Sequence, residues 1–507
     1  MLVVNDTDDG IKLASVEGRT VMATVILGSA VASLTATVVN VALPTLASDL
    51  DASSSGQKWI INGYTLTLAA FMLIGGSFSD RFGRLRVYRI GVIWFAVASL
   101  LCALAWNTQA LIGFRILQGV GGALLTPGSL AIIEASLSKS DRGRGVGQWS
   151  GITGLAGAVG PLLGGLLVEI SWRWVFVINV PIAVAVVVLS RWVPESRDPT
   201  ARDAPLDLGG AALSALVLGA VSYALIEGPE GALTSFEVAV AVVGLVGAGL
   251  LWRLQRRLRH PLLPLDLFAS RPFAIANLLT FLIYGGMGVL FFLLSVQLQV
   301  TAGWTPLQAG TALLPVTVIM LLLSSRAGAL SQRIGPRWPL TIGPLVVAGG
   351  MVMMTRIGPD ASFATDVLPA VTVFGFGLAG LVAPITSTAM GAVPNSRAGA
   401  ASGTNNAVAR TGGLLAVASI PGLVGLNGTA LSDPALLDPG FSRAMVVSAG
   451  LVATGGLLAM LLLRSDELAT ATSADEELSL QSGDRGRRRI VNPCPVDGQL
   501  TSVGTDR

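Results

Sequence analysis

The sequence predicts an all-helical membrane protein with fourteen transmembrane helices, arranged as two six-helix bundles with a two-helix insert between them. Three observations lead to this fold class. The composition is strongly apolar, with 52% hydrophobic and only 12% charged residues, unlike that of a water-soluble globule. Continuous apolar runs without strict alternation predict helices rather than a barrel. The loop GSFSDRFGRLRVYR, which begins at Gly76, returns in weakened form as GALSQRIGPR from Gly328, which indicates a duplicated bundle.

The individual spans follow from hydropathy. Crossing about 30 Å of hydrocarbon takes about 20 apolar residues, and fourteen runs meet this length. The first run is longer than a signal-peptide core, so we expect it to be a retained span. The runs begin near Val21, Trp59, Val87, Ala110, Gly145, Trp174, Asp207, Ser235, Phe273, Leu307, Trp338, Ala364, Ala398 and Phe441.

The spacing of the two echoed loops predicts the domain organisation. Eight runs lie between the loops, whereas duplication of a six-helix unit would place six there. We therefore expect two inserted spans, at about 207–226 and 235–253. The expected domains are a cytoplasmic N-terminal segment (1–20), a six-helix bundle (21–195), the insert with its flanking loops (196–271), a second six-helix bundle (272–463) and a disordered cytoplasmic tail (464–507).

The basic residues orient the chain in the membrane. Of the 33 Lys and Arg residues, Arg115 and Arg410 fall inside spans, and nearly all others fall on the side that holds both termini. The positive-inside rule then places both termini in the cytoplasm. High Ala, Gly, Val and Arg usage with scant Lys suits a GC-rich bacterial genome, so the expected location is the inner membrane of a bacterium. The basic residues on the opposite side are Lys58, Arg173, Arg356 and Arg443.

The loop after the second span carries a cluster of glycine and charged residues, in the pattern G-x-x-x-D-R-x-G-R. Glycine permits a tight turn and close helix approach, while carboxylate and guanidinium groups form charge-assisted hydrogen bonds. We expect the cluster to latch neighbouring helix ends in one conformation and to release them in another. Its residues are Gly76, Asp80, Arg81, Gly83 and Arg84.

Two further spans carry unusual residues. The fourth places Arg115 within the membrane, beside Gln118. Insertion scales assign ~2.5–3.5 kcal/mol or more to such an Arg, so a functional role is the first hypothesis; the alternative is that Arg115 only ties the carbonyl groups of adjacent helices. The fifth span has Gly160 and Gly164 four residues apart, with Pro161 between them. Small residues allow close helix packing, and proline bends a helix.

In this combination the chain resembles the major facilitator superfamily, and within it the fourteen-helix drug:proton antiporter branch. The resemblance implies the major facilitator fold and alternating access. It also implies export of amphipathic drugs, antibiotics or secondary metabolites, driven by the proton gradient. It rests on the loop motif, R-x-x-Q-G in the fourth span, G-P-x-x-G-G in the fifth, VVNVALP (38–44), SWRWVFVINVP (171–181), TPLQAG (305–310) and GAASGTNNAVARTGG (399–413).

The resemblance also implies roles for single residues. Asp80, Arg81, Gly83 and Arg84 would form the conformational latch, and Arg115, with Gln118 beside it, would couple protonation to movement. The antiporter hinge would consist of Gly160, Pro161, Gly164 and Gly165.

One position departs from the branch. Its members usually carry Asp in the first span, where this chain has Thr35 in LTATVVNVALP. No Asp or Glu falls in the middle of any predicted span. A buried carboxylate is the ordinary proton carrier. Glu134, at the end of the fourth span and one face away from Arg115, is the best substitute. The alternative is that Glu134 is only an interfacial residue whose side chain extends toward water.

Several polar residues in or near spans are candidates for a substrate cavity between the halves. Each could equally form a hydrogen bond between helices. Because no acid lies in mid-span, we expect neutral, zwitterionic or anionic amphiphiles, and Arg115 and Arg410 would tolerate negative charge. The candidates are Thr35, Asn40, Tyr64, Asn179, Tyr284, Gln297, Gln299 and Arg410.

The remaining function classes can be ranked. A weakly coupled or uniport metabolite exporter is one alternative, and a membrane sensor that keeps the fold without transport is another. An enzyme is not expected, because no nucleophile–base pair, metal cluster or nucleotide-binding loop stands out. We expect a monomer whose partners are a small amphipathic molecule, protons and the lipid bilayer, with no cofactor, metal or nucleic acid.

Overall fold

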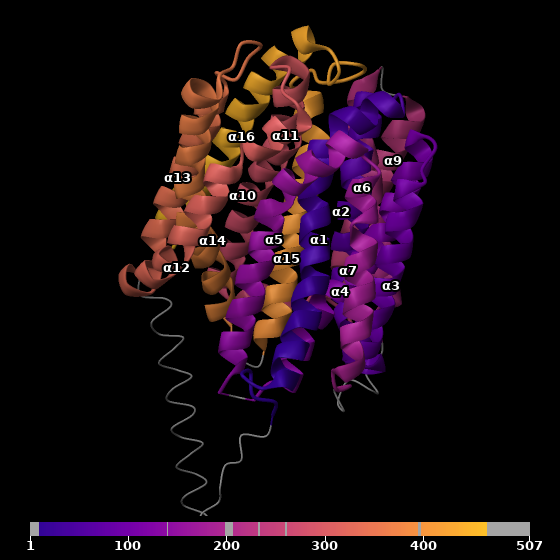
Figure 1. Ribbon diagram of the computed structural model, residues 1–507, viewed down its shortest axis with the longest axis vertical. Coiled ribbons are helices and arrows are strands. Elements are labelled where there is room, and N and C mark those ends of the chain that lie inside the picture. The colour runs from indigo at the N-terminus through magenta and orange to yellow at the C-terminus, as the bar shows by residue number, and fades with distance from the viewer. Residues whose placement is uncertain are drawn as a thin grey trace, which may run out of the picture.

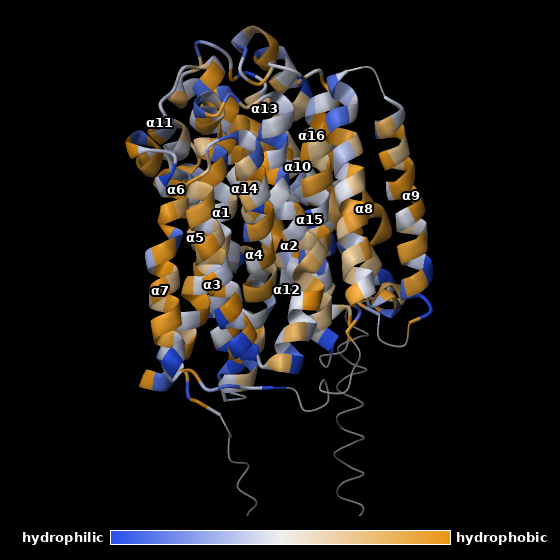
Figure 2. Ribbon diagram, turned by 90° about the vertical axis from the view of Figure 1, so that its right-hand side faces the viewer, coloured by the Kyte–Doolittle hydropathy of each residue, from blue (hydrophilic) through white to orange (hydrophobic). Residues whose placement is uncertain are grey.

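The computed structural model describes residues 10–138, 140–197, 206–231, 234–258, 261–393 and 397–463. Within these ranges long helices run side by side (Figure 1). Figure 2 shows apolar residues along the helix bodies and hydrophilic residues gathered toward the two ends, as in a membrane protein. The predicted disordered tail (464–507) and residues 1–9 lie outside the described residues.

The first bundle is built from the first six predicted spans. Its helices are α1 (Val16–Asp49), α2 (Ser54–Phe82), α3 (Arg84–Ala103), α4 (Thr108–Ser136) and α5 (Arg142–Ile170), followed by a sixth span made of α6 (Trp174–Val177), α7 (Asn179–Leu189) and the short η1 (Ser190–Trp192). Ser15, Ser53 and Asn107 cap α1, α2 and α4, each accepting a hydrogen bond from the backbone N–H three residues on. The helices therefore begin at these caps, before the apolar runs that predicted them.

The insert and the second bundle follow. The insert consists of α8 (Leu208–Glu227), the one-turn η3 (Gly228–Glu230) and α9 (Ser235–Gln255), and the turn η4 (Leu265–Ala269) leads into the second bundle. That bundle contains α10 (Arg271–Val296), η5 (Gln297–Thr301), α11 (Pro306–Thr311), α12 (Leu314–Ile334), α13 (Arg337–Met354), η6 (Phe363–Val367), α14 (Leu368–Gly391), α15 (Ala398–Leu423) and α16 (Pro434–Leu462). The elements η5 and η6 are π-helical turns.

Thirteen helical segments of the described chain are long and apolar enough to cross a membrane. They match every predicted span except the thirteenth, which forms α15. This helix has 26 residues, a sufficient length, but its Ser, Thr, Asn and Arg side chains make it more polar. It packs against α10, α2 and α8, and neighbouring helices can satisfy polar side chains there. The count of fourteen transmembrane helices stays a prediction that depends on α15.

The two bundles repeat the same packing. In the first, α4 packs against α2 and α3, and α1 against α5; in the second, α14 packs against α12 and α13, and α10 against α15. The echoed glycines also correspond, because Gly83 ends α2 with φ 111° and Gly335 ends α12 with φ 81°. These left-handed conformations favour glycine, so the sequence echo reflects one helix-ending turn used twice.

The bundles meet along a seam to which each contributes a central helix. Figure 1 shows the first bundle in indigo to magenta beside the second in pink to yellow, with α5 and α15 near the middle. Accordingly α5 packs against α11 and α12 of the second bundle, and α15 against α2 of the first. The insert adds α8 against both α2 and α15, with α9 outside it (Figure 2).

Candidate functional site

The two bundles are joined mainly at one end of the molecule, here called the closed end. It lies opposite the terminus end, where the described chain begins and finishes (Figure 1). The Ser54 backbone N–H donates to the carbonyl of Gly428 (2.9 Å), and the Leu431 N–H donates to Ser54 Oγ (3.2 Å). The side-chain amide of Gln299 donates to the carbonyl of Val41 (2.9 Å). Each of these bonds joins the first bundle to the second.

The apolar core shows the same asymmetry. One buried cluster joins the closed-end half of the first bundle, including Leu43 and Phe176, to residues throughout the second bundle such as Phe292 and Phe441. The terminus-end half of the first bundle has a separate core around Tyr88. Buried apolar surface therefore unites the bundles at the closed end, whereas at the terminus end the first bundle keeps a core of its own.

The predicted hinge helix α5 lies between the bundles. A Cβ atom added at Gly160 would stand 2.0 Å from Thr37 Oγ1, so this glycine admits α1 of the same bundle. Gly164 likewise faces α1, whereas an added Cβ at Gly165 would stand 2.7 Å from the Cα atom of Leu307 in the second bundle. Opposite α5, a Cβ at Gly310 would stand 2.2 Å from the Pro161 carbonyl oxygen.

A buried polar network surrounds Arg115, which is 1% exposed. Its Nε–H donates to the carbonyl of Ile60 (3.0 Å), and Nη1 donates to Gln118 Oε1 (2.6 Å). The guanidinium carbon lies 4.5 Å from the centre of the Tyr64 ring, a cation–π geometry. Gln118 Nε2 in turn donates to Ser99 Oγ (2.7 Å). The network thus links α4 to α2 and α3, and it joins Arg115 directly to Gln118.

Thr35 lies at the far end of the same network. Its hydroxyl donates to Asn179 Oδ1 (3.1 Å), and the Asn179 amide donates to Ser99 Oγ (3.2 Å). Ser99 therefore joins the Arg115 and Thr35 branches, and the chain of hydrogen bonds crosses five helices of the first bundle. Ser99 was not among the predicted site residues, because a lone serine in an apolar span gives no distinguishing signal.

A second arginine lies beside the seam. Arg410 on α15 is half-buried, and its charge acts electrostatically on both Tyr64 of α2 and Tyr284 of α10. Among the described residues Arg410 has no hydrogen bond or ion pair. It therefore differs from Arg115, whose guanidinium is held by protein groups.

The other predicted substrate residues lie apart from this pair of tyrosines. Gln297 is buried in the second bundle, where its amide donates to the Ile357 carbonyl and to Asp438. Gln299 joins the bundles at the closed end through Val41. Asn40 is 9% exposed, and its Oδ1 has no hydrogen-bond partner among the described groups.

The predicted latch lies at the terminus end. Asp80 Oδ1 accepts a hydrogen bond from Arg84 Nε (2.9 Å). A residue that sequence analysis missed completes the turn: the two carboxylate oxygens of Glu195 accept from the backbone N–H groups of Leu85 and Arg86, each at 3.0 Å. A carboxylate at a helix N-terminus is favourable, but Glu195 sits in a charged loop whose proximity only the fold creates.

Glu134 belongs with this latch rather than with Arg115. Its side chain is exposed at the end of α4, within electrostatic reach of Arg84, Arg142 and Asp80. Nineteen residues of helix separate Glu134 from Arg115, which is about 28 Å at 1.5 Å per residue. Glu134 thus lies at the end of its span, as expected, and its role in proton coupling stays a prediction.

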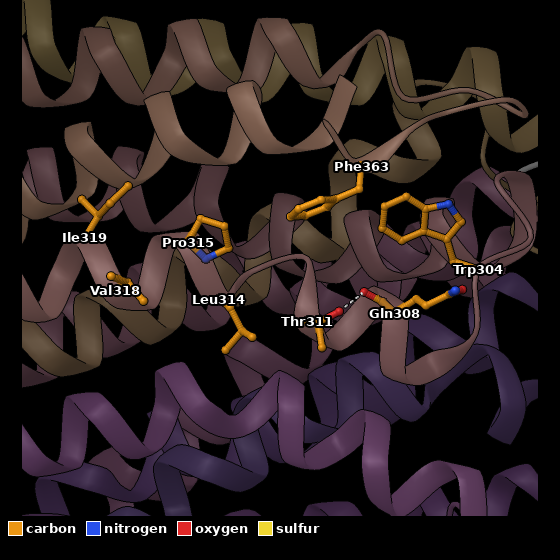
Figure 3. Close-up of a pocket in the computed structure, with 8 residues that line it drawn as sticks. All are labelled: Trp304, Gln308, Thr311, Leu314, Pro315, Val318, Ile319 and Phe363. Atoms are coloured by element: carbon orange, nitrogen blue, oxygen red, sulfur yellow. Dashed lines mark hydrogen bonds between the residues drawn. The ribbon is translucent and has the colours of Figure 1, made fainter. Parts of the chain in front are cut away.

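A cavity of about 630 Å³ opens beside α11 and α12 near the closed end (Figure 3). Such a volume is typical of pockets for drug-sized ligands. None of the predicted substrate residues lines it, and Val318 at its wall is 51% exposed, so it opens on the outer surface of the bundle. Its lining residues are Trp304, Gln308, Thr311, Leu314, Pro315, Val318, Ile319 and Phe363.

Comparisons with known proteins agree with this architecture. The family model described as "Major Facilitator Superfamily" matches residues 25–417. The chain is 35% identical to the puromycin resistance protein pur8 of Streptomyces alboniger over 82% of both chains. It is 32% identical to the methylenomycin A resistance protein of Streptomyces coelicolor over 92% of this chain and 95% of the relative.

Two further comparisons concern export and the fold. The tetracenomycin C resistance and export protein of Streptomyces glaucescens is 33% identical over 78% of this chain and 73% of its own. Among solved structures, a bacterial homolog of the human lysosomal transporter Spinster superposes with a TM-score of 0.64 at 16% identity. That match covers 90% of this chain and 99% of the other.

Proposed function

Because the chain belongs to the Major Facilitator Superfamily, we propose that it exports amphipathic antibiotics or related secondary metabolites from a bacterial cell by alternating access. The observation that carries this proposal is the one-ended closure of two repeated bundles. Two halves whose shared core and seam hydrogen bonds lie mainly at one end are arranged so that they can rock about a central site.

The closed end faces the outside of the cell in this proposal. The asymmetry of Lys and Arg supports cytoplasmic termini, and the terminus end carries the latch with Asp80 and Arg84. The described conformation is then open, or ready to open, toward the cytoplasm, where an exporter collects its substrate.

Arg410, Tyr64 and Tyr284 form the proposed substrate-recognition cluster. A charged residue within a span is a functional candidate by default, and Arg410 has no ion pair among the described groups that would neutralise it. Described acids lie at helix ends, so the site favours neutral, zwitterionic or anionic amphiphiles over strongly cationic ones.

Proton coupling is proposed to pass through a carboxylate at a span end, since Thr35 is occupied by its hydrogen bond to Asn179 and a hydroxyl does not titrate near neutral pH. Glu134 is the favoured group because it neighbours Asp80 and Arg84 of the latch. Loose coupling is a second candidate, favoured by the neutral side chains at the Thr35 end of the network.

Transport into inverted membrane vesicles tests the proposal. Vesicles that contain the full chain should accumulate at least one amphiphile from a panel of neutral, anionic and cationic compounds, relative to vesicles without it. An uncoupler should abolish the accumulation. Uptake that resists the uncoupler and only equilibrates the amphiphile, without concentrating it, would favour loose coupling. The absence of uptake for every class would contradict export.

A further inference from the structure

The two-helix insert ends in a short acidic turn at the closed end of the seam. Helix α8 packs against α2 of the first bundle and α15 of the second, and α9 covers α8 from outside. Figure 2 shows α9 as the outermost helix of this side. The turn between them, Glu227 to Glu230, therefore lies where the outer ends of both bundles meet.

Glu230 contacts both bundles at once. One carboxylate oxygen pairs with Lys58 Nζ of α2 (3.0 Å), and the other accepts a hydrogen bond from the Gly428 N–H (2.6 Å). Gly428 lies in the loop between α15 and α16, and its carbonyl also accepts from the Ser54 N–H. The first bundle, the insert and the second bundle are therefore joined through the backbone of Gly428 and the carboxylate of Glu230.

Burial makes this junction sensitive to the loss of a partner. The Lys58 side chain is fully buried and that of Glu230 only 17% exposed, so neither charge is well solvated. An ion pair that is shielded from water is strongly coupled, and removal of one member leaves the other uncompensated. Glu227 adds to the attachment by accepting from Ser55 Oγ (2.6 Å) and Trp59 Nε1 (2.8 Å), both on α2.

We propose that the turn of the insert is the outer clamp of the transport cycle. Glu230 holds Lys58 of one bundle and the Gly428 amide of the other, and it must release one of them whenever the outer end opens. The insert thereby becomes a gating element that sets how often the closed end opens. The inference rests on the alternating access proposed above.

Accessibility of a buried seam residue measures the clamp directly. Ser54 is 1% exposed and bonds to Leu431 across the seam, so Ser54→Cys in a full-length chain free of Cys102 and Cys494 reports opening to a membrane-impermeant thiol reagent. On this background Glu230→Gln should label faster from outside, by about 5- to 150-fold, the usual range for coupling between sites.

Glu237→Gln is the matched control. It removes one carboxylate from the same hairpin, but within the described part of the chain Glu237 bonds only to Thr234 of its own helix cap, so the labelling rate should stay at the parent value. If Glu230→Gln is not inserted in the membrane, Glu230→Asp replaces it, because the shorter side chain keeps the charge but does not reach both partners.

A charge exchange separates the clamp from a simple ion pair. Lys58→Glu with Glu230→Lys restores opposite charges, but a lysine at 230 offers no acceptor to the Gly428 N–H, so labelling should stay fast. Slow labelling of the exchanged protein would contradict the clamp, as would equal rates for Glu230→Gln and Glu237→Gln. The labelling needs no substrate, so these results are independent of whether export is observed.

Discussion

At the scale of single residues, Arg115 and Thr35 belong to one hydrogen-bond network. The sequence indicated that Arg115 was unusual and that Thr35 replaced an expected acid, but only the fold shows that they are ends of one network through Gln118, Ser99 and Asn179. These five residues lie on four different helices and share no spacing along the chain, so no sequence pattern could group them.

The first prediction concerns the route of protons. Glu134→Gln should weaken uncoupler-sensitive efflux more than Thr35→Val does, because only the glutamate can carry a proton. Thr35→Val loses one hydrogen bond between helices, worth ~0.6 kcal/mol on average in membranes. Efflux should be measured for both variants across pH. Loss of transport in Thr35→Val with a silent Glu134→Gln would instead assign Thr35 to substrate contact or helix packing.

The second prediction concerns substrate charge. Arg410→Gln should lower efflux of an anionic amphiphile about 5- to 150-fold, the range of a 1–3 kcal/mol interaction, and leave a matched neutral compound nearly unchanged. Arg326→Gln is the control, because Arg326 is exposed and, among the residues that the structure describes, bonds only to the Leu322 carbonyl of its own helix. Equal loss for both compounds would show that Arg410 supports the fold rather than recognising charge.

At the scale of elements, hydropathy located the helices but not their interruptions. The tenth predicted span proved to be α11 and α12 with a break between them, and α10 and α14 each adjoin a π-helical turn. Such irregularities depend on how neighbouring helices accept the freed backbone groups, which a single apolar run does not encode. In contrast, the close packing of α5 could be predicted from the spacing of its small residues, because close helix packing requires them.

The third prediction concerns the contact between α5 and α11. Gly310→Ala places a methyl group 2.2 Å from the Pro161 carbonyl oxygen. Helices α11 and α5 should then no longer pack closely near the closed end, and efflux should fall. Gly349→Ala in α13, where an added Cβ meets nothing within 4 Å, should leave efflux intact. Normal efflux by well-expressed Gly310→Ala would show that the bundles need not approach this closely.

At the scale of the whole molecule, the two ends carry different devices. The terminus end has the predicted latch around Asp80 and Arg84, and the closed end has a shared core, hydrogen bonds across the seam and the proposed clamp of the insert. The duplication and the position of the insert were both inferred from the echoed loops. Which end is closed was not, because the echoed loops show only which segments repeat and where spans are added.

The fourth prediction concerns the number of spans. If α15 crosses the membrane, a thiol-specific reagent outside the cell should reach Ser432→Cys and Gly231→Cys, whereas Arg397→Cys should react only after permeabilisation. All three positions are exposed. Labelling of Arg397→Cys in intact cells would remove α15 from the set of spans and leave thirteen.

The most direct test of alternating access follows two distances in the reconstituted protein. Spin labels at Trp106 and Leu436 report on the closed end, and labels at Arg86 and Ile334 on the terminus end; all four side chains are exposed and each pair joins the two bundles. With an exported amphiphile and a proton gradient, we predict that the first distance lengthens while the second shortens. Distances that stay fixed, or that change in the same direction at both ends, would contradict the rocking of two halves about a central site.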